Sequence, residues 1–376
     1  MKFVASSTDL LSHLQAISKV INTKNTLPIL DNFLFRLENN ELEITASDLE
    51  TTLITKMTLE NASGDGIIAL PAKLLNDTLK EFPEQPLTFD INDESLAVTI
   101  SSENGQFNIP GQNGVDFPKI PEIKEDKKSS VRMGHDVLFT GIDKTHFASA
   151  EDELRPVMNG IFVELSTESV TFVASDAHKL VRYIRKDVKA DSEASFILPK
   201  KPATLLRSIL PKEENEVLVE FDDKNVFIQL TDYKMFSRLV EGTYPSYNSV
   251  IPTDNPNKLT IDRLDLYNSL RRVSVFSNQA SNLIKMNLTG NQVTVSAQDI
   301  DFSISAYERL NAQYEGEDME IGFKSSFLVE ILSNLAVPEV VFELSDPSRA
   351  GIIVPAENEN PDEDILMLIM PMMIGA

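Results

Sequence analysis

The sequence repeats itself with a period of about 125 residues, and this repeat restricts the possible fold more than any other feature of the chain. An apolar strand that leads into an amphipathic helix occurs at 68–75, again at 197–202, and more loosely at 321–328. Pro71 and Pro199 are 128 residues apart, and Phe323 follows 124 residues later. A chain of 376 residues is also longer than one hydrophobic core usually organises.

Two further elements recur with nearly the same spacing. A strand ends in Ala, a polar residue and Asp at Asp48, Asp176 and Asp299, and a helix opens each copy at 10–21, 137–148 and 264–276. Because three independent elements agree, we predict three copies of one domain. The expected domains are 1–125, 126–251 and 252–376, and the charged segment 123–130 and the turn-rich segment 252–257 serve as linkers.

Hydrophobic periodicity predicts two helices in each domain. Apolar residues spaced as Leu10, Leu14 and Ile17 share one face of a helix. Alternation such as Leu42 and Ile44 indicates strands. The predicted class is α+β, with three tandem copies of a two-helix, antiparallel-sheet domain. The six expected helices span 8–21, 72–82, 136–150, 200–210, 262–278 and 324–336.

Charge is distributed unevenly along the chain. There are 58 acidic and 34 basic residues, and the net charge of -24 would repel a polyanion if it were spread evenly. The predicted helices are instead neutral to mildly basic, and the strands and loops are acidic. This segregation favours a helical face directed toward phosphates. The alternative is that Lys and Arg are abundant in helices because they are good helix formers.

Composition excludes several classes of protein. Without cysteine there are no disulfides, thiolate metal sites or cysteine nucleophiles, and a cytoplasmic location is expected. No apolar stretch reaches the roughly 20 residues of a membrane-spanning helix, and residues 1–10 have no signal-peptide core. The apolar run 365–376 contains Pro371 and is expected to be a final strand.

No catalytic motif is found. The GxxxxGK[ST] and GxGxxG patterns are absent, and His13, His135, His146 and His178 lack metal-ligand spacing. His13 and His146 are expected on exposed helix faces. Ser175, Asp176 and His178 are too close in sequence for a nucleophilic triad. The recurring aspartates are expected to cap turns. We therefore predict a protein that is not an enzyme and uses no cofactor or metal.

Several segments resemble signatures of one known family. Thr26-Leu27-Pro28-Ile29-Leu30, the segment 174–180, Tyr244-Pro245-Ser246-Tyr247 and Met370-Pro371-Met372 are similar to motifs of the bacterial DNA polymerase III beta subunit, the beta sliding clamp. The resemblance covers the whole chain. It implies three like domains, a head-to-tail homodimer that closes a ring with helices lining the hole, and a processivity factor that encircles duplex DNA without sequence preference. Its expected partners are DNA polymerases, the clamp loader and other proteins that carry a clamp-binding peptide.

Candidate site residues come from this resemblance together with the basic cluster. The DNA-binding candidates are Lys24, Lys73, Arg155, Lys200, Lys201, Arg207, Arg271 and Arg272. The resemblance implies a partner-peptide pocket formed by Met158, Ser175, Ala177, His178, Lys179, Leu180, Pro245, Ser249, Val250, Ala350, Leu368, Ile369, Met370, Pro371 and Met372. It also implies dimer contacts from Phe107 and Ile109 to Val275 and Phe276 of the partner chain.

The chain departs from the family pattern at four places. Arginines are expected at Ser249 and Met373, the loop 152–157 retains only Arg155 of the expected residues, and Gly375-Ala376 is additional to the pattern. A different class of protein, a non-catalytic repeat scaffold that binds only proteins, remains as the alternative function.

Overall fold

The computed structural model describes residues 1–121, 123, 128–152 and 154–374. The described chain divides into two compact units. Unit 1 contains Met1–Phe139 and Lys201–Leu239, and unit 2 contains Thr140–Lys200 and Val240–Ala376. The division therefore runs through the second predicted domain. The predicted boundary at 125 lies outside the described residues.

The order of elements repeats three times along the chain, as the sequence predicts. A strand runs directly into a helix at β1–α1, β11–α3 and β19–α5, and again at β6–α2, β15–α4 and β24–α6. The six α-helices found in the described residues are α1 (Ser7–Ser18), α2 (Ala72–Lys80), α3 (His135–His146), α4 (Lys200–Ile209), α5 (Arg263–Val273) and α6 (Ser325–Ser333).

Unit 1 contains two antiparallel sheets, whose strands are given in spatial order. Sheet 1 consists of β5 (Ala62–Ser63), β1 (Lys2–Ser6), β7 (Pro86–Ile91), β8 (Ala97–Ser101) and β9 (Gln106–Pro110). Sheet 2 consists of β10 (Gln112–Asn113), β6 (Gly66–Pro71), β2 (Asn32–Glu38), β3 (Glu41–Ser47), β4 (Thr51–Thr58), β18 (Tyr233–Arg238), β17 (Asn225–Gln229), β16 (Glu216–Phe221) and β11 (Ser129–Gly134).

Unit 2 also contains two antiparallel sheets. Sheet 3 consists of β15 (Ala194–Pro199), β12 (Gly160–Leu165), β13 (Val170–Ser175), β14 (Lys179–Arg185), β27 (Glu363–Ile369), β26 (Gly351–Pro355), β25 (Glu339–Leu344), β19 (Asn257–Asp262) and β23 (Gln313–Glu315). Sheet 4 consists of β22 (Ile304–Asn311), β21 (Gln292–Asp299), β20 (Leu283–Thr289) and β24 (Met319–Lys324).

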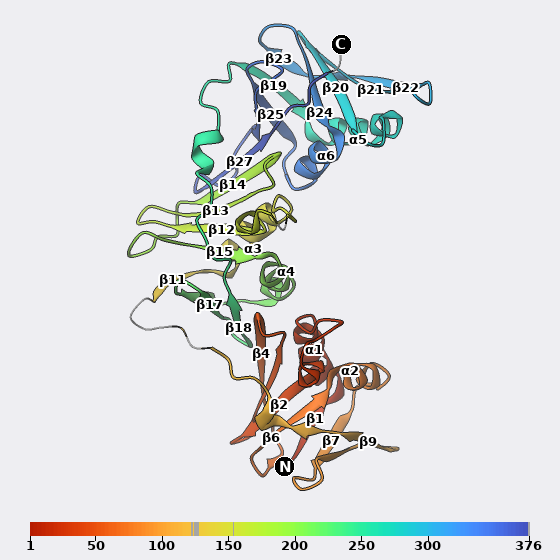
Figure 1. Cartoon of the computed structure of the whole chain (residues 1–376), viewed down its shortest axis with the longest axis vertical. Coiled ribbons are helices and arrows are strands. Elements are labelled where there is room, and N and C mark those ends of the chain that lie inside the picture. The colour runs from red at the N-terminus through yellow and green to blue at the C-terminus, as the bar shows by residue number, and fades with distance from the viewer. Residues whose placement is uncertain (122, 124–127, 153, 375–376) are drawn as a thin grey trace. The chain divides into compact units, whose positions relative to one another are not determined.

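The long sheets join consecutive repeats. In sheet 2, β4 pairs with β18 in the register Thr51↔Ser237, and in sheet 3, β14 pairs with β27 in the register Lys179↔Ile369. These partner strands are far apart in sequence and side by side in space (Figure 1). Each junction unites two repeats through main-chain hydrogen bonds as well as side-chain packing.

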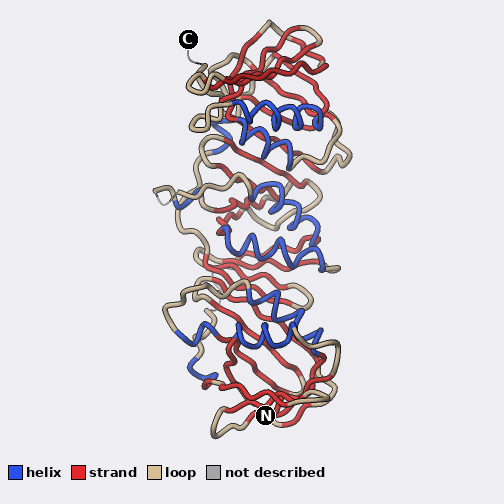
Figure 2. Tube along the Cα trace, turned by 90° about the vertical axis from the view of Figure 1, so that its right-hand side faces the viewer, coloured by secondary structure: helices blue, strands red, loops and turns tan. Residues whose placement is uncertain are grey.

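The helices cover the sheets with their apolar faces. In α1, the Ser6 side chain accepts a hydrogen bond from the Asp9 amide at the helix start, and Leu10, Leu14 and Ile17 are fully buried. In unit 2, α5 and α6 lie side by side (Figure 2) and contribute Leu270 and Ile331 to a core shared with sheets 3 and 4. Amphipathic helices on antiparallel sheets give the predicted α+β class.

Candidate functional site

A mostly apolar pocket of about 410 Å³ opens within unit 2, beside the β14–β27 junction. Leu180 from β14 and Leu368 from β27 form its floor, and Met370, 40% exposed, lies at its edge. The connector that follows the second repeat forms the opposite wall through Pro245 and Val250. The pocket is therefore built by both repeats that share the junction.

A tight turn between β13 and β14 forms one side of the pocket. Asp176 Oδ1 accepts hydrogen bonds from the amides of His178 and Lys179, both at 2.9 Å. Asp48 and Asp299 accept amide hydrogen bonds in the corresponding turns, which confirms that the recurring aspartates cap turns. Ala177, in this turn, has φ 73°.

A buried lysine lies beside this turn. Lys179 Nζ is 2.8 Å from Asp176 and 3.0 Å from Glu330, and it also lies over the ring of Phe327. Burial acts to lower the pKa of Lys179, but the hydrogen bonds to the two carboxylates outweigh burial and the pKa is raised. The lysine is thus charged and electrostatically balanced, which fixes this wall of the pocket.

Two tyrosines anchor the connector segment 244–250 on sheet 3. The ring of Tyr244 stacks on Phe162 at 4.8 Å, and the Tyr247 hydroxyl donates a 2.7 Å hydrogen bond to Glu164. Burial, and then the Glu164 carboxylate, raises the pKa of Tyr247 to about 12. Both side chains are nearly fully buried. The wall is therefore packed and hydrogen-bonded to β12 before any ligand binds.

The structure brings together most of the predicted pocket residues. Those that line the pocket are Met158, Ser175, Ala177, Lys179, Leu180, Pro245, Val250, Leu368 and Met370. The others lie nearby in different settings. His178 stacks on Phe327, Ser249 donates to the Ser246 carbonyl, and Ala350 packs against the same apolar cluster.

Three more of the predicted pocket residues also lie outside its lining. Ile369 is fully buried in the core of unit 2 and is wrong as a wall residue, because its side chain alternates to the opposite face from Leu368 and Met370. Met372 forms a backbone bridge with Gly322, and Pro371 precedes it. Tyr244, Ser246 and Tyr247 line the pocket but were not among the predicted residues. The Tyr-Pro-Ser-Tyr motif that contains them was a usable signal.

The corresponding face of sheet 2 is more polar, although Phe236 occupies the position of Leu368. Thr45 and Thr52 occupy the register positions that Val173 and Leu180 occupy in sheet 3. The Thr52 hydroxyl is hydrogen-bonded to Ser47 at 2.8 Å. The repeat thus copies the backbone of the junction but only part of the apolar floor.

Half of the predicted DNA-binding cations are already paired with acidic groups. The pairs are Arg155 with Asp152, Lys200 with Glu151, Lys201 with Asp48, and Arg272 with Glu308. Lys201 also donates to the Val20 carbonyl and to Asn22. Arg207 has interactions within the chain. Lys24, Lys73 and Arg271 form no ion pair with any other described residue.

The predicted dimer contacts lie at the ends of the two short sheets. Phe107 is 40% exposed on β9, whereas Ile109 is buried. Val275 and Phe276 are exposed in the turn that follows α5. β9 and β22 are edge strands whose outer sides pair with no other described strand.

The expectation that His13 and His146 lie on exposed helix faces is wrong, because both side chains are half-buried. His13 is partly buried, with its ring near Tyr233 and its Nδ1 hydrogen-bonded to Thr55, and burial lowers its pKa. The adjacent repeat covers this helix face, which the helix sequence alone does not reveal. Ser175 and Asp176 are both engaged within their turn.

The described residues contain no group of three or more His, Cys, Asp or Glu that could hold a metal ion. Within the same residues, no helix combines the length and apolar composition needed to cross a membrane.

Comparison with known proteins decides the family. Family models of the N-terminal, central and C-terminal domains of the DNA polymerase III beta subunit match residues 1–121, 132–246 and 248–373. The chain belongs to the DNA polymerase III beta subunit family. A family member named beta sliding clamp, from Pseudomonas aeruginosa, is 28% identical over 375 residues and is matched over 100% of both chains. Another, from Synechocystis sp., is 31% identical and covers 94% of this chain.

Solved beta subunit structures share the fold. A Pseudomonas aeruginosa sliding clamp bound to griselimycin matches with a TM-score of 0.93 at 26% identity, over 100% of both chains. A Thermotoga maritima beta subunit matches with a TM-score of 0.90 at 25% identity, again over 100% of both chains. The predicted family and the three-domain clamp fold are confirmed. The boundaries at 125 and 251 stay predictions.

Proposed function

We propose that the chain is a DNA sliding clamp, a processivity factor that encircles duplex DNA and tethers DNA polymerases during replication without catalysing a reaction. Relatives that match the whole of this chain are named beta sliding clamps, which supports the proposal. As a sliding clamp, the chain would need no cofactor and would act in the cytoplasm.

The numbers of strands in the four sheets carry the proposal of a ring. Sheet 2 combines five strands of the first repeat with four of the second, and sheet 3 combines four of the second with five of the third. Sheet 1 has five strands and sheet 4 has four. If β22 of one protomer pairs with β9 of its partner, a third type of nine-stranded junction forms. Head-to-tail pairing at both ends closes a homodimer.

The surface at these two ends favours such pairing. An unpaired edge strand is a template for another strand, and exposed apolar groups beside it mark an interface. Phe107, Val275 and Phe276 are exposed at these ends.

The size of duplex DNA also requires more than one chain. Helices pack ~10 Å apart, so six in a circle leave a bore of ~9 Å, whereas twelve leave about 28 Å. A duplex is more than ~17 Å across, because its major groove alone is ~8.5 Å deep. We therefore propose that the helices of two protomers line the hole.

The pocket beside the β14–β27 junction is the proposed docking site for polymerases, the clamp loader and other proteins with a clamp-binding peptide. Its apolar floor and preformed wall suit the insertion of a few apolar side chains.

A protein-binding scaffold is the second candidate, and the carboxylate-paired cations favour it. Retention on closed circular DNA separates the two functions. The clamp is expected to sediment as a dimer at micromolar concentration, and a loaded clamp is expected to stay on a closed circle and slide off when the circle is cut. The proposed ring would be contradicted by a monomer in sedimentation, or by a clamp that stays on the DNA after the circle is cut.

A further inference from the structure

The turn between β21 and β22 differs from its two counterparts. In the first and second repeats, two residues separate the capping aspartate from the residue opposite it, Thr51 for Asp48 and Lys179 for Asp176. In the third repeat, Asp299 lies opposite Ile304, so the turn contains four residues. This longer turn carries Ile300 and Phe302, which are 79% and 76% exposed.

At both junctions within the chain, the short turn accepts a main-chain hydrogen bond. The Glu50 carbonyl accepts from the Arg238 amide, and the His178 carbonyl accepts from the Met370 amide, both at 2.8 Å. The first residue after each turn, Thr51 or Lys179, is paired with Ser237 or Ile369 of the neighbouring strand. The donor of the hydrogen bond is the next residue along that strand. We call this the closing hydrogen bond, because it extends the strand pairing by one residue at the end of the junction.

The strand registers identify the equivalent donor position in the first repeat. Ser237 lies opposite Val226 in the neighbouring hairpin strand, and Ile369 lies opposite Gly351. In sheet 1 the residue equivalent to Val226 and Gly351 is Val98, and its strand partner is Ile109. The following residue is Pro110, which has no amide hydrogen to donate. The closing hydrogen bond therefore cannot form where β9 meets another chain.

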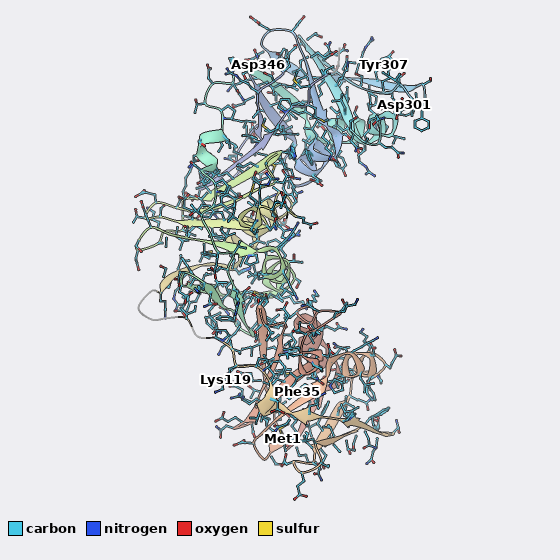
Figure 3. The ribbon with its side chains drawn as sticks, viewed as in Figure 1. Met1, Phe35, Lys119, Asp301, Tyr307 and Asp346 are labelled. Carbon is cyan, nitrogen blue, oxygen red and sulfur yellow. The ribbon has the colours of Figure 1, made fainter. Side chains whose placement is uncertain are left out.

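We propose that Ile300 and Phe302 pack on Pro110 of a second copy of this chain, so that apolar contact replaces the missing hydrogen bond. The proposal rests on the proposed ring and names the residues that seal its interface. Two exposed apolar side chains in an extended turn suit this partner, because the turn adjoins an edge strand whose outer side pairs with no other described strand. Asp301, which lies between them in sequence, is in the turn before β22, and Tyr307 is a residue of β22 (Figure 3).

The test compares dimer dissociation in sedimentation for the wild type, Ile300→Ser with Phe302→Ser, and the control Leu154→Ser. Leu154 is 91% exposed in unit 2 and is not one of the residues expected at the dimer interface. The double variant is expected to raise the dissociation constant at least about tenfold, while Leu154→Ser leaves it unchanged. Thermal unfolding of the double variant at a concentration where it is monomeric should match that of monomeric wild type, because both side chains are exposed within the protomer.

A double-mutant cycle then tests the contact itself. Phe302→Ser is expected to weaken the dimer less in the Pro110→Ala background than in the wild type, because Pro110→Ala removes the packing partner and also restores an amide that can form the closing hydrogen bond. A wild-type monomer would overturn the ring. A wild-type dimer whose dissociation constant is unchanged by the double variant, or a strictly multiplicative cycle, would overturn this inference and leave the ring standing.

Discussion

One hydrogen bond to a residue outside the pocket lining helps to hold the connector wall in place. Tyr247 is hydrogen-bonded to Glu164, a residue of β12 that does not reach the pocket. Because the pKa of Tyr247 is raised to about 12, its hydroxyl remains a donor across the physiological range. Glu164 therefore acts as a positioning residue for the connector wall.

Glu164→Ala removes this acceptor and frees the wall to move. We expect the dissociation constant of a clamp-binding peptide to rise about tenfold, or ~1.4 kcal/mol, within the range for loss of a hydrogen bond to a charged group. Isothermal titration measures the affinity. Glu164→Gln, which keeps an acceptor oxygen, should recover most of it. Equal affinities for wild type and Glu164→Ala would refute the positioning role.

Met370→Ala tests the floor of the pocket. Loss of its burial against an inserted peptide is expected to cost about 1–3 kcal/mol of binding free energy. Folding should change little, since the side chain is already 40% exposed. Met373→Ala is the matched control, because Met373 is 82% exposed and lies outside this pocket. Equal losses in the two variants, measured by peptide titration on folded dimers, would discard the pocket assignment.

Asp176 should make unfolding dependent on acid pH. Burial acts to raise the pKa of Asp176, but the Lys179 ammonium and two amides hold it below 3.8. A carboxyl with a lowered folded-state pKa stabilises the fold above its unfolded pKa, and this stability is lost as pH falls through the folded pKa. Asp176→Asn is therefore expected to lower the free energy of unfolding by about 2 kcal/mol at neutral pH. Denaturant titrations should show the difference shrinking below pH 3.8, and a constant difference would argue against the ionised pair.

The limits of sequence reasoning at this scale are visible in two residues. Tyr247 in a turn-rich connector looks like an ordinary core aromatic, because its partner Glu164 lies in a distant strand. Lys201 looks like a phosphate ligand in a basic cluster, yet it is held by Asp48 from the preceding repeat. Burial and long-range pairing decide both roles, and neither is a local property of the sequence.

At the scale of elements, periodicity located all six predicted helices but extended some of their ends. The expected helix 8–21 ends at Ser18, because Val20 and Ile21 continue the apolar spacing after the chain has turned at Lys19. The pairing of β4 with β18 and of β14 with β27 could not be predicted, since alternation specifies a strand without naming its neighbour.

The same registers predict how two chains join. Ile304 should lie opposite Ile109 of the partner, and Ser305 opposite Asn108. Because the chain has no cysteine, Asn108→Cys with Ser305→Cys introduces the only thiols, and opposed strand positions meet disulfide geometry. Oxidation is expected to give a covalent dimer on a denaturing gel. The control Asn108→Cys with Arg309→Cys is four residues out of register and should stay monomeric on the gel. The reverse pattern would refute this register.

At the scale of the whole molecule, the net charge of -24 leaves DNA contact to a few cations. Lys24→Glu with Lys73→Glu should weaken retention on DNA and lower the slope of log affinity against log salt by about one for each phosphate contact removed. The change in charge is matched by Lys2→Glu with Lys258→Glu, two exposed lysines paired with Asp90 and Glu343. Filter binding across a salt series measures both slopes. An equal loss in both variants would attribute the effect to total charge and not to these two sites.

The more polar face of sheet 2 has a consequence for how many partner proteins the proposed ring can bind. Thr45 and Thr52 replace Val173 and Leu180 at the first junction, so we expect the proposed docking pocket of each protomer at the second junction. A closed dimer then has a valency of two, however many proteins carry the peptide. On the proposed ring, polymerases and repair factors compete for these two sites. Relative affinity and local concentration, not free space on the ring, then decide which of them is bound.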